Sequence, residues 1–282
     1  MLSDAFLSRL DTLCLAMKGR ASGGAGGTRR SRQTGSSAEF SDYREYIPGD
    51  DIRRLDWNAM ARFDKVFLKL FLEEQESAVT VLLDGSASMG EKWDTARKAA
   101  EAAGYLALTG GDRLRLVVLQ EKGSRESPAL AGRQAYGRLT QFLDTIEPSG
   151  GGTLTESVLR LQGLRKGMCF LISDCYETGG IGQALDSLRY RAQECAVIQT
   201  LSEFELDPAL DGALKLTDSE SGRTVDLLAD RSALDAYRDA LEAFLKEVRG
   251  NCSSREAAHL LLDSEEPFEE CFIPLLSRNG MI

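Results

Sequence analysis

The stretch "AVTVLLDGSASMG", residues 78–90, joins an unbroken apolar run to one acid and two serines. Its first six residues favour a strand that is buried on both faces, as in parallel sheets. The strand would end at Asp84, with Ser86 and Ser88 following at alternate positions. The simplest interpretation is a strand followed by a helix cap, in which a serine accepts a backbone N–H and Asp84 complements the helix dipole. The alternatives are a metal site and a strained catalytic nucleophile. Residues elsewhere in the chain are needed to choose among these three interpretations.

Apolar runs of the same kind recur along the chain. They lie at 114–119, 168–172, 195–200 and 258–262. Helical patterns separate them, over 91–109, 132–146, 154–164, 180–191 and 231–249. Because buried strands alternate with helices, the sequence predicts the α/β class, with a doubly wound, mainly parallel sheet of the Rossmann type.

Two segments depart from this alternation. Residues 213–228, "ALKLTDSESGRTVDLL", alternate around Ser-Glu-Ser-Gly and predict an inserted β-hairpin. The N-terminus predicts an amphipathic helix, which a Gly/Ser/Arg-rich loop follows at 20–37. We therefore expect an N-terminal arm over residues 1–75 and an α/β domain over residues 76–282.

Charge and composition exclude several classes of function. The first 72 residues carry 12 basic and 9 acidic side chains, whereas the remainder carries 22 and 35, so the main body is acidic and unsuited to nucleic acid. A single histidine, His259, removes most zinc chemistry and most histidine-based catalysis. No apolar run approaches the roughly 18 residues of a membrane helix. Six scattered cysteines without a CxxC pair fit a reducing compartment, so we expect a cytoplasmic protein without membrane insertion.

Oxygen-bearing side chains follow the predicted strands at the edge where α/β proteins bind ligands. Asp84, Ser86 and Ser88 follow the first buried strand, and Asp174 follows the strand at 168–173. The loop "PSGGGTLTES", residues 148–157, adds Thr153. Carboxylates mixed with hydroxyls suit a hard cation such as Mg²⁺ or Mn²⁺. With neutral hydroxyls as ligands the metal stays electron-poor, so it would accept an Asp or Glu from a partner protein.

The same five residues resemble the metal-ion-dependent adhesion site of von Willebrand factor A domains. That family has D-x-S-x-S in one loop, a threonine in a second loop and an aspartate in a third, and all five positions match in order over a resemblance that spans roughly residues 76–275. Thr155 is a weaker candidate for the threonine. The resemblance implies a doubly wound fold and protein–protein interaction through a divalent cation.

A second resemblance covers residues 39–77, "EFSDYREYIPGDDIRRLDWNAMARFDKVFLKLFLEEQES". The blocks YREY, PGDD, RLDW and AR resemble the bacterial family called "domain of unknown function 58". That family implies an adaptor or chaperone-like partner of a MoxR-type AAA+ ATPase, with no catalytic activity. Within the chain, we expect Arg53, Arg54, Asp56 and Arg62 to fasten the arm through ion pairs, with Trp57 as an apolar plug; a partner-binding surface is the alternative.

A serine hydrolase is the rival interpretation of the same stretch. Residues 86–90 read S-x-S-x-G, one residue away from a nucleophile elbow, and Ser88, Asp174 and His259 follow in the order Ser–Asp–His. Against it, His259 falls inside an apolar strand and not on a loop. A dehalogenase-type phosphatase would need a second acid where Ser86 stands. Glu203 and Asp207 lie at the same sheet edge, where we interpret them as solvated loop residues.

Overall fold

The computed structural model describes most of the chain, in nine ranges. They are residues 1–22, 40–47, 50, 55–56, 66–71, 78–121, 123–208, 212–217 and 222–281. The chain divides into two compact units, of which the larger combines Met1–Gly19 with Ser77–Ile282 and the smaller is Arg20–Glu76.

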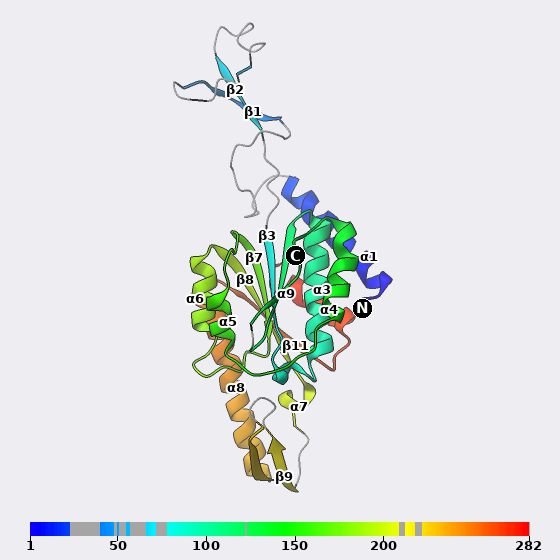
Figure 1. Ribbon diagram of the computed structural model, residues 1–282, viewed down its shortest axis with the longest axis vertical. Coiled ribbons are helices and arrows are strands. Elements are labelled where there is room, and N and C mark those ends of the chain that lie inside the picture. Colours follow the sequence, from blue (N-terminus) through cyan, green and yellow to red (C-terminus); the bar gives the residue numbers. More distant parts are fainter. Residues whose placement is uncertain are drawn as a thin grey trace. The chain divides into compact units, whose positions relative to one another are not determined.

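The larger unit is built on a seven-stranded sheet (Figure 1). Its strands are β3 (Ala78–Asp84), β4 (Arg113–Leu119), β5 (Arg125–Glu126), β6 (Leu130–Ala131), β7 (Gly167–Ser173), β8 (Gln193–Leu201) and β11 (Ala258–Asp263). Their order is β11-β8-β7-β3-β4-β5, with β6 also paired to β4. All pairs are parallel except those that β5 and β6 make with β4. This is the doubly wound order 2-1-3-4-5 of the parallel strands, in which the first and third, β3 and β7, are neighbours, so the predicted fold class is confirmed.

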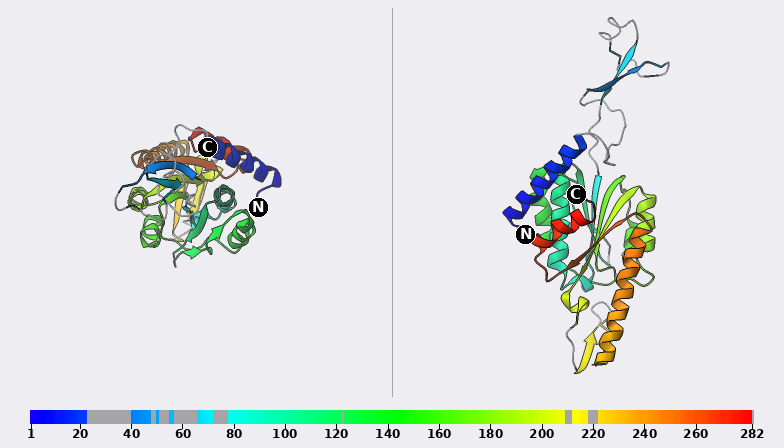
Figure 2. Two further views of the ribbon diagram at one scale, coloured as in Figure 1. Left: turned by 90° about the horizontal axis from the view of Figure 1, so that it is seen from above. Right: turned by 180° about the vertical axis from the view of Figure 1, so that it is seen from behind.

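Helices cover both faces of the sheet (Figures 1 and 2). One face is covered by α1 (Asp4–Ser22), α3 (Trp93–Gly110), α4 (Tyr136–Asp144) and α9 (Phe268–Arg278). The other is covered by α5 (Leu154–Arg160), α6 (Gly182–Tyr190) and α8 (Arg231–Ser253). Short helical turns lie at η2 (Ala87–Met89), η3 (Arg133–Ala135) and α7 (Glu203–Leu206).

The strands read as continuous apolar runs because successive side chains enter two different cores. In β3, Val81 and Leu83 belong to the core beneath α3, whereas Leu82 belongs to the core beneath α5 and α6. The alanines of α3 are buried as well, among them Ala99 and Ala103. Small side chains at these positions let α3 pack close to the sheet.

The N-terminal helix α1 is part of the larger unit. Phe6 and Leu10 are fully buried in the core, and the Phe6 ring meets Phe268 of α9 edge-on at 5.8 Å. The hydroxyl of Ser3 donates to Glu269 at 2.5 Å. This differs from the sequence-based division at residue 75, because the apolar face of α1 finds its partner in a helix near residue 270.

The inserted hairpin is present as β9 (Gly212–Thr217) and β10 (Thr224–Ala229), paired antiparallel with Thr217 opposite Thr224. It lies beside the first half of α8, beyond the edge at which α7 follows β8 (Figure 1). The hairpin and the first half of α8 therefore project beyond the carboxyl ends of the parallel strands (Figure 1).

The smaller unit contains β1 (Phe40–Glu45) and β2 (Phe67–Phe71), which pair antiparallel. Arg44 and Asp50, both in the signature blocks, form an ion pair at 2.7 Å, and Asp50 also accepts the Ile47 backbone N–H at 3.0 Å. These contacts join two of the blocks to each other. Asp56 is buried, and its backbone N–H donates to Phe67. The roles predicted for Arg53, Arg54, Trp57 and Arg62 fall on residues outside the described ranges.

Candidate functional site

The two predicted acids lie on either side of the point where the strand order reverses. Asp84 ends β3 and Asp174 follows β7, and these strands are parallel neighbours in the sheet. Both side chains are buried. Ligands of doubly wound proteins bind at this switch point, beyond the carboxyl ends of the strands. The topology therefore brings the two acids together where the sequence placed them.

Asp84 is held by the loops on both sides of it. Its Oδ1 accepts the Ser86 backbone N–H at 2.9 Å, and its Oδ2 accepts the Ser173 hydroxyl at 2.6 Å. Burial raises the pKa of Asp84 above its ordinary value, the nearby Asp174 charge adds to the rise, and the bonds from Ser173 and Ser86 oppose it. The carboxylate form is thus short of positive compensation, which a bound cation would supply.

The two serines are not used as helix caps. Ser86 precedes the short helix η2, yet its side chain makes no capping bond. Its hydroxyl instead lies 2.9 Å from the Ser88 hydroxyl. Helix α3 starts later, after Lys92, again without a side-chain cap. The simplest interpretation of the sequence, a serine cap, is therefore wrong, and both hydroxyl oxygens keep lone pairs for another ligand.

Backbone hydrogen bonds fasten the loop that carries Thr153 to the loop that carries Ser86 and Ser88. Ala87 donates its N–H to Gly150 at 2.8 Å, and Ser149 donates to Gly85 at 2.9 Å. Gly150 has φ of +77°, a left-handed conformation that suits glycine. The loop then delivers Thr153 to the start of α5, where its Oγ1 accepts the Glu156 N–H at 3.3 Å. Thr153 is thus a helix cap whose oxygen retains a second lone pair.

Thr155 is the less suitable of the two threonines. Its hydroxyl donates to Glu177 at 2.6 Å, and its backbone N–H donates to the same carboxylate at 3.0 Å. Glu177 follows Asp174 by three residues, so this contact joins the segment after Thr153 to the loop that carries Asp174. In the same third loop, Cys175 adopts φ of +64°, which is unusual for a residue with a side chain. Outliers of this kind cluster at functional sites.

Lys92 is a site residue that the sequence interpretation missed. Its ammonium lies 2.9 Å from Asp174 Oδ2 and 2.7 Å from Glu205 Oε1, and its side chain is only 2% exposed. Burial opposes its charge, but the two carboxylates outweigh burial and raise the pKa of Lys92. A lysine just before a helix gives no sign of burial in sequence. Its second partner, Glu205, also forms a capping box with Ser202 at the start of α7.

Glu203 and Asp207 are both exposed, as their interpretation as solvated residues requires, although Glu203 begins helix α7 and does not lie in a loop. Asp207 pairs with Arg238 of α8 at 3.1 Å. Both Asp207 and Arg238 are largely exposed to solvent, so this contact contributes little to stability.

His259 is a packed residue of β11. Its Nε2 lies 2.9 Å from Gln199 Oε1, and Gln199 in turn donates to the Asp174 carbonyl oxygen at 3.1 Å. The histidine thus reaches the third loop only through Gln199, whereas Ser88 contacts Ser86. A nucleophile and its base need direct hydrogen-bond reach, so these contacts give no support to the hydrolase.

A pH test follows from this packing. Burial, helped by the positive charge of Arg249, lowers the pKa of His259 to about 4. The unfolded chain protonates near its ordinary value, so the contribution of His259 is complete above about pH 6.5 and is lost as the pH falls towards about 4. We expect urea unfolding of His259→Gln to show a shallower acid dependence across this window, by up to about 1.4 kcal/mol per pH unit. Identical pH profiles would contradict the burial of a neutral histidine.

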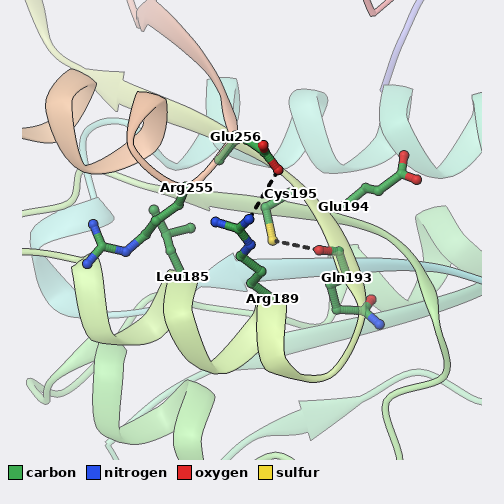
Figure 3. A pocket seen from close by; sticks show the side chains of 8 residues that line it. Leu185, Arg189, Gln193, Glu194, Cys195, Arg255 and Glu256 are labelled. Atoms are coloured by element: carbon green, nitrogen blue, oxygen red, sulfur yellow. Dashed lines mark hydrogen bonds and ion pairs between the residues drawn. The ribbon is translucent and has the colours of Figure 1, made fainter. Parts of the chain in front are cut away.

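A separate pocket lies at the opposite end of the sheet, beside the amino end of β8 (Figure 3). Gln193, Glu194 and Cys195 line it from the first residues of β8, far from the strand ends that carry the acids. Arg189 pairs with Glu256 at 3.3 Å, and Arg255 pairs with Asp186 at 2.8 Å. Because both guanidinium groups already have acidic partners, we assign no ligand to this pocket.

The donor set at the switch point fits a hard divalent cation. In the described ranges, no three histidine, cysteine or acidic side chains gather in a way that could hold a metal. A cation held by Asp84 and Asp174 would therefore depend on hydroxyl and water oxygens as well. Magnesium takes few carboxylates and retains waters, so this composition suits it better than zinc.

The strand order and the polar switch point define a doubly wound α/β protein of the Rossmann type. The family model described as "Protein of unknown function DUF58" matches residues 42–247, and the chain belongs to that family. Uncharacterized proteins of Mycobacterium bovis and Mycobacterium tuberculosis are 27% identical over 250 residues, which cover 85% of this chain and 78% of theirs.

Solved structures with a similar fold share little sequence with the chain. The conserved hypothetical protein BatB from Bacteroides thetaiotaomicron is 13% identical, with a TM-score of 0.43, and the match covers 73% of this chain and 100% of that one. The SpRpn10 VWA domain is 9% identical, with a TM-score of 0.38, and the match covers 70% and 93%. Among the helices that the structure describes, none has the length and apolar character that a membrane crossing requires.

Proposed function

We propose that this protein binds a protein partner through a divalent cation, Mg²⁺ or Mn²⁺, held at the switch point. Asp84, Ser86, Ser88 and Thr153 would hold the metal directly or through water, and Asp174 would ligate it or orient a bound water. The metal would supply a Lewis-acidic centre for an Asp or Glu of the partner. We propose no catalytic turnover of a substrate by this protein.

One observation carries the proposal. Asp84 ends one strand and Asp174 follows its parallel neighbour, Asp84 accepts the hydroxyl of Ser173, and the Ser86 and Ser88 hydroxyls lie side by side without capping a helix. Asp84 is buried with only neutral hydrogen-bond donors, from Ser86 and Ser173, which is costly for a carboxylate. A bound cation would supply the positive charge that Asp84 lacks, with the two serine oxygens as further ligands.

A MoxR-type AAA+ ATPase is the partner that we propose, on the resemblance of the signature blocks, with the chain acting as its adaptor in the reducing cytoplasm. None of the six cysteines, all within the described ranges, is in a disulfide, which fits such a compartment. The projecting hairpin and α8 lie at the same edge as the metal site (Figure 1). A docked partner would therefore meet them together with the cation.

Metal titration of the wild type and Asp84→Ala tests the site. At 100 times the dissociation constant, a metal that binds only the folded state stabilises it by about 2.7 kcal/mol. We expect this gain in the wild type and in Asp94→Ala, whose exposed carboxylate pairs with Lys98 on the surface. We expect no gain in Asp84→Ala, measured by calorimetric melting with Mg²⁺ or Mn²⁺. Equal gains in the wild type and Asp84→Ala would refute the site.

A pull-down separates metal binding from the choice of partner. We expect a MoxR-type ATPase to be retained by the wild type in Mg²⁺, and to be lost with EDTA or with Asp84→Ala. Retention of the ATPase that is unaffected by EDTA and by Asp84→Ala would show that it docks away from the metal site. No retention under any condition would remove the ATPase from the proposal and leave the metal site to the titration.

A further inference from the structure

Lys92 places a fixed positive charge inside the proposed metal site. Its ammonium bridges Asp174 at 2.9 Å and Glu205 at 2.7 Å, and both the lysine and Asp174 side chains are almost fully excluded from solvent. The ammonium also lies 5.5 Å from the centre of the Tyr176 ring. A buried ion pair of this kind holds its geometry and resists screening by salt.

Both oxygens of Asp174 are already engaged. Its Oδ1 accepts the Tyr176 backbone N–H at 3.1 Å, and its Oδ2 accepts the Lys92 ammonium. Asp84, by contrast, receives only neutral donors, from Ser86 and Ser173. The two acids of the site therefore differ: one is neutralised by the protein itself, and the other is not.

Glu205 gives Lys92 a second, fixed carboxylate. Its Oε2 accepts the Ser202 backbone N–H at 2.8 Å in the capping box, which leaves Oε1 for the lysine. Its carbonyl oxygen accepts the Tyr237 hydroxyl at 2.6 Å, which fixes α7 to α8. Lys92 can thus give up Asp174 and keep an acidic partner.

From this arrangement we infer that Lys92 competes with the divalent cation for Asp174, and so determines how tightly the site binds metal. The inference rests on the metal site proposed above. The Lys92 ammonium repels a cation that is ligated by Asp174, because like charges within a few ångströms repel strongly in a site with little water. Lys92 lowers the metal affinity of the protein alone, and Glu205 moderates that effect by sharing the lysine.

Two substitutions should move metal affinity in opposite directions. Lys92→Met removes the competing charge with a side chain of similar length, so we expect Mn²⁺ to bind at least about tenfold more tightly. Glu205→Gln keeps a residue that supports the capping box but leaves Lys92 to Asp174 alone, so we expect Mn²⁺ to bind several-fold more weakly. A lysine with a purely structural role would lower stability when replaced but would not produce opposite changes in affinity.

Calorimetric titration with Mn²⁺ measures these changes, with circular dichroism as the check on folding. Lys98→Met is the matched control, because it removes a lysine whose partner, Asp94, is largely exposed, and we expect its affinity to equal that of the wild type. If Lys92→Met does not fold, the weaker binding of Glu205→Gln still decides the matter.

The outcomes separate this inference from the metal site itself. Binding by the wild type that Asp84→Ala abolishes and that Lys92→Met and Glu205→Gln leave unchanged would overturn the role of Lys92 alone. Binding that appears only in Lys92→Met would support it, since the lysine would then be what suppresses the wild-type site. Absence of Mn²⁺ binding in every variant would overturn both.

Discussion

Replacement of Phe6 by alanine is expected to lower the free energy of unfolding by about 3–5 kcal/mol, the usual cost of removing a buried phenylalanine ring. Phe6 is 1% exposed and packs edge-on against Phe268, with the Arg9 guanidinium 5.8 Å from its ring centre. Its loss would leave a cavity between α1 and α9 at the flank of the sheet. Urea unfolding followed by circular dichroism measures the change.

Tyr190→Ala is the control for Phe6→Ala, because it removes an aromatic ring that is 92% exposed. A surface truncation of this kind should change stability by no more than about 0.5 kcal/mol. A cost below about 1 kcal/mol for Phe6→Ala would mean that α1 is not part of the folded α/β unit in solution.

Substitution of Gly85 by alanine is expected both to destabilise the protein and to abolish its response to metal. The added Cβ would lie 2.7 Å from Val118 Cγ1 and 3.1 Å from the Leu119 carbonyl oxygen, so the loop must move away from β4. Overpacking of this kind costs about 1–3 kcal/mol. The displaced segment carries Ser86 and Ser88, so the stabilisation by Mg²⁺ should disappear with it.

Gly137→Ala serves as the comparison for Gly85→Ala. A Cβ at Gly137, in α4, would meet nothing within 4 Å, so we expect unchanged stability or a gain of up to about 1 kcal/mol, with a full metal response. Melting curves with and without Mg²⁺ measure both effects. A normal metal response in a destabilised Gly85→Ala would show that the tight loop serves folding and not the site.

Much of the fold could be predicted because the signal is local. The continuous apolar runs reflect strands with cores on both faces, as Leu82 and Leu83 of β3 show. The packing of α1 could not be predicted, because an amphipathic helix shows which face is buried but not what covers it. Its partner α9 is contacted across 266 positions of sequence, from Ser3 to Glu269. The antiparallel strands β5 and β6 contain only two residues each and leave no periodic pattern.

The placement of the two acids of the candidate site could be predicted for the same reason. Strand ends at one edge of a parallel sheet place Asp84 and Asp174 together, whatever the details of the loops. The contacts of Thr155 with Glu177 and of Lys92 with Asp174 depend on side chains that meet from separate loops. A long lysine side chain can reach many positions, so its partner follows from the three-dimensional packing alone.

The docking of α1 against α9 has a consequence for synthesis on the ribosome. The apolar face of α1 is made first, but Phe268, which covers Phe6, is made only after some 260 further residues. At typical translation rates of about 5–20 residues per second, the Phe6–Phe268 contact can form only roughly 15 to 50 seconds after Phe6 is made. The contacts of α1 with α3, such as that of Asp11 with Tyr105, can form well before then. During translation, α1 can therefore dock on the sheet side of its native site before its cover from α9 exists.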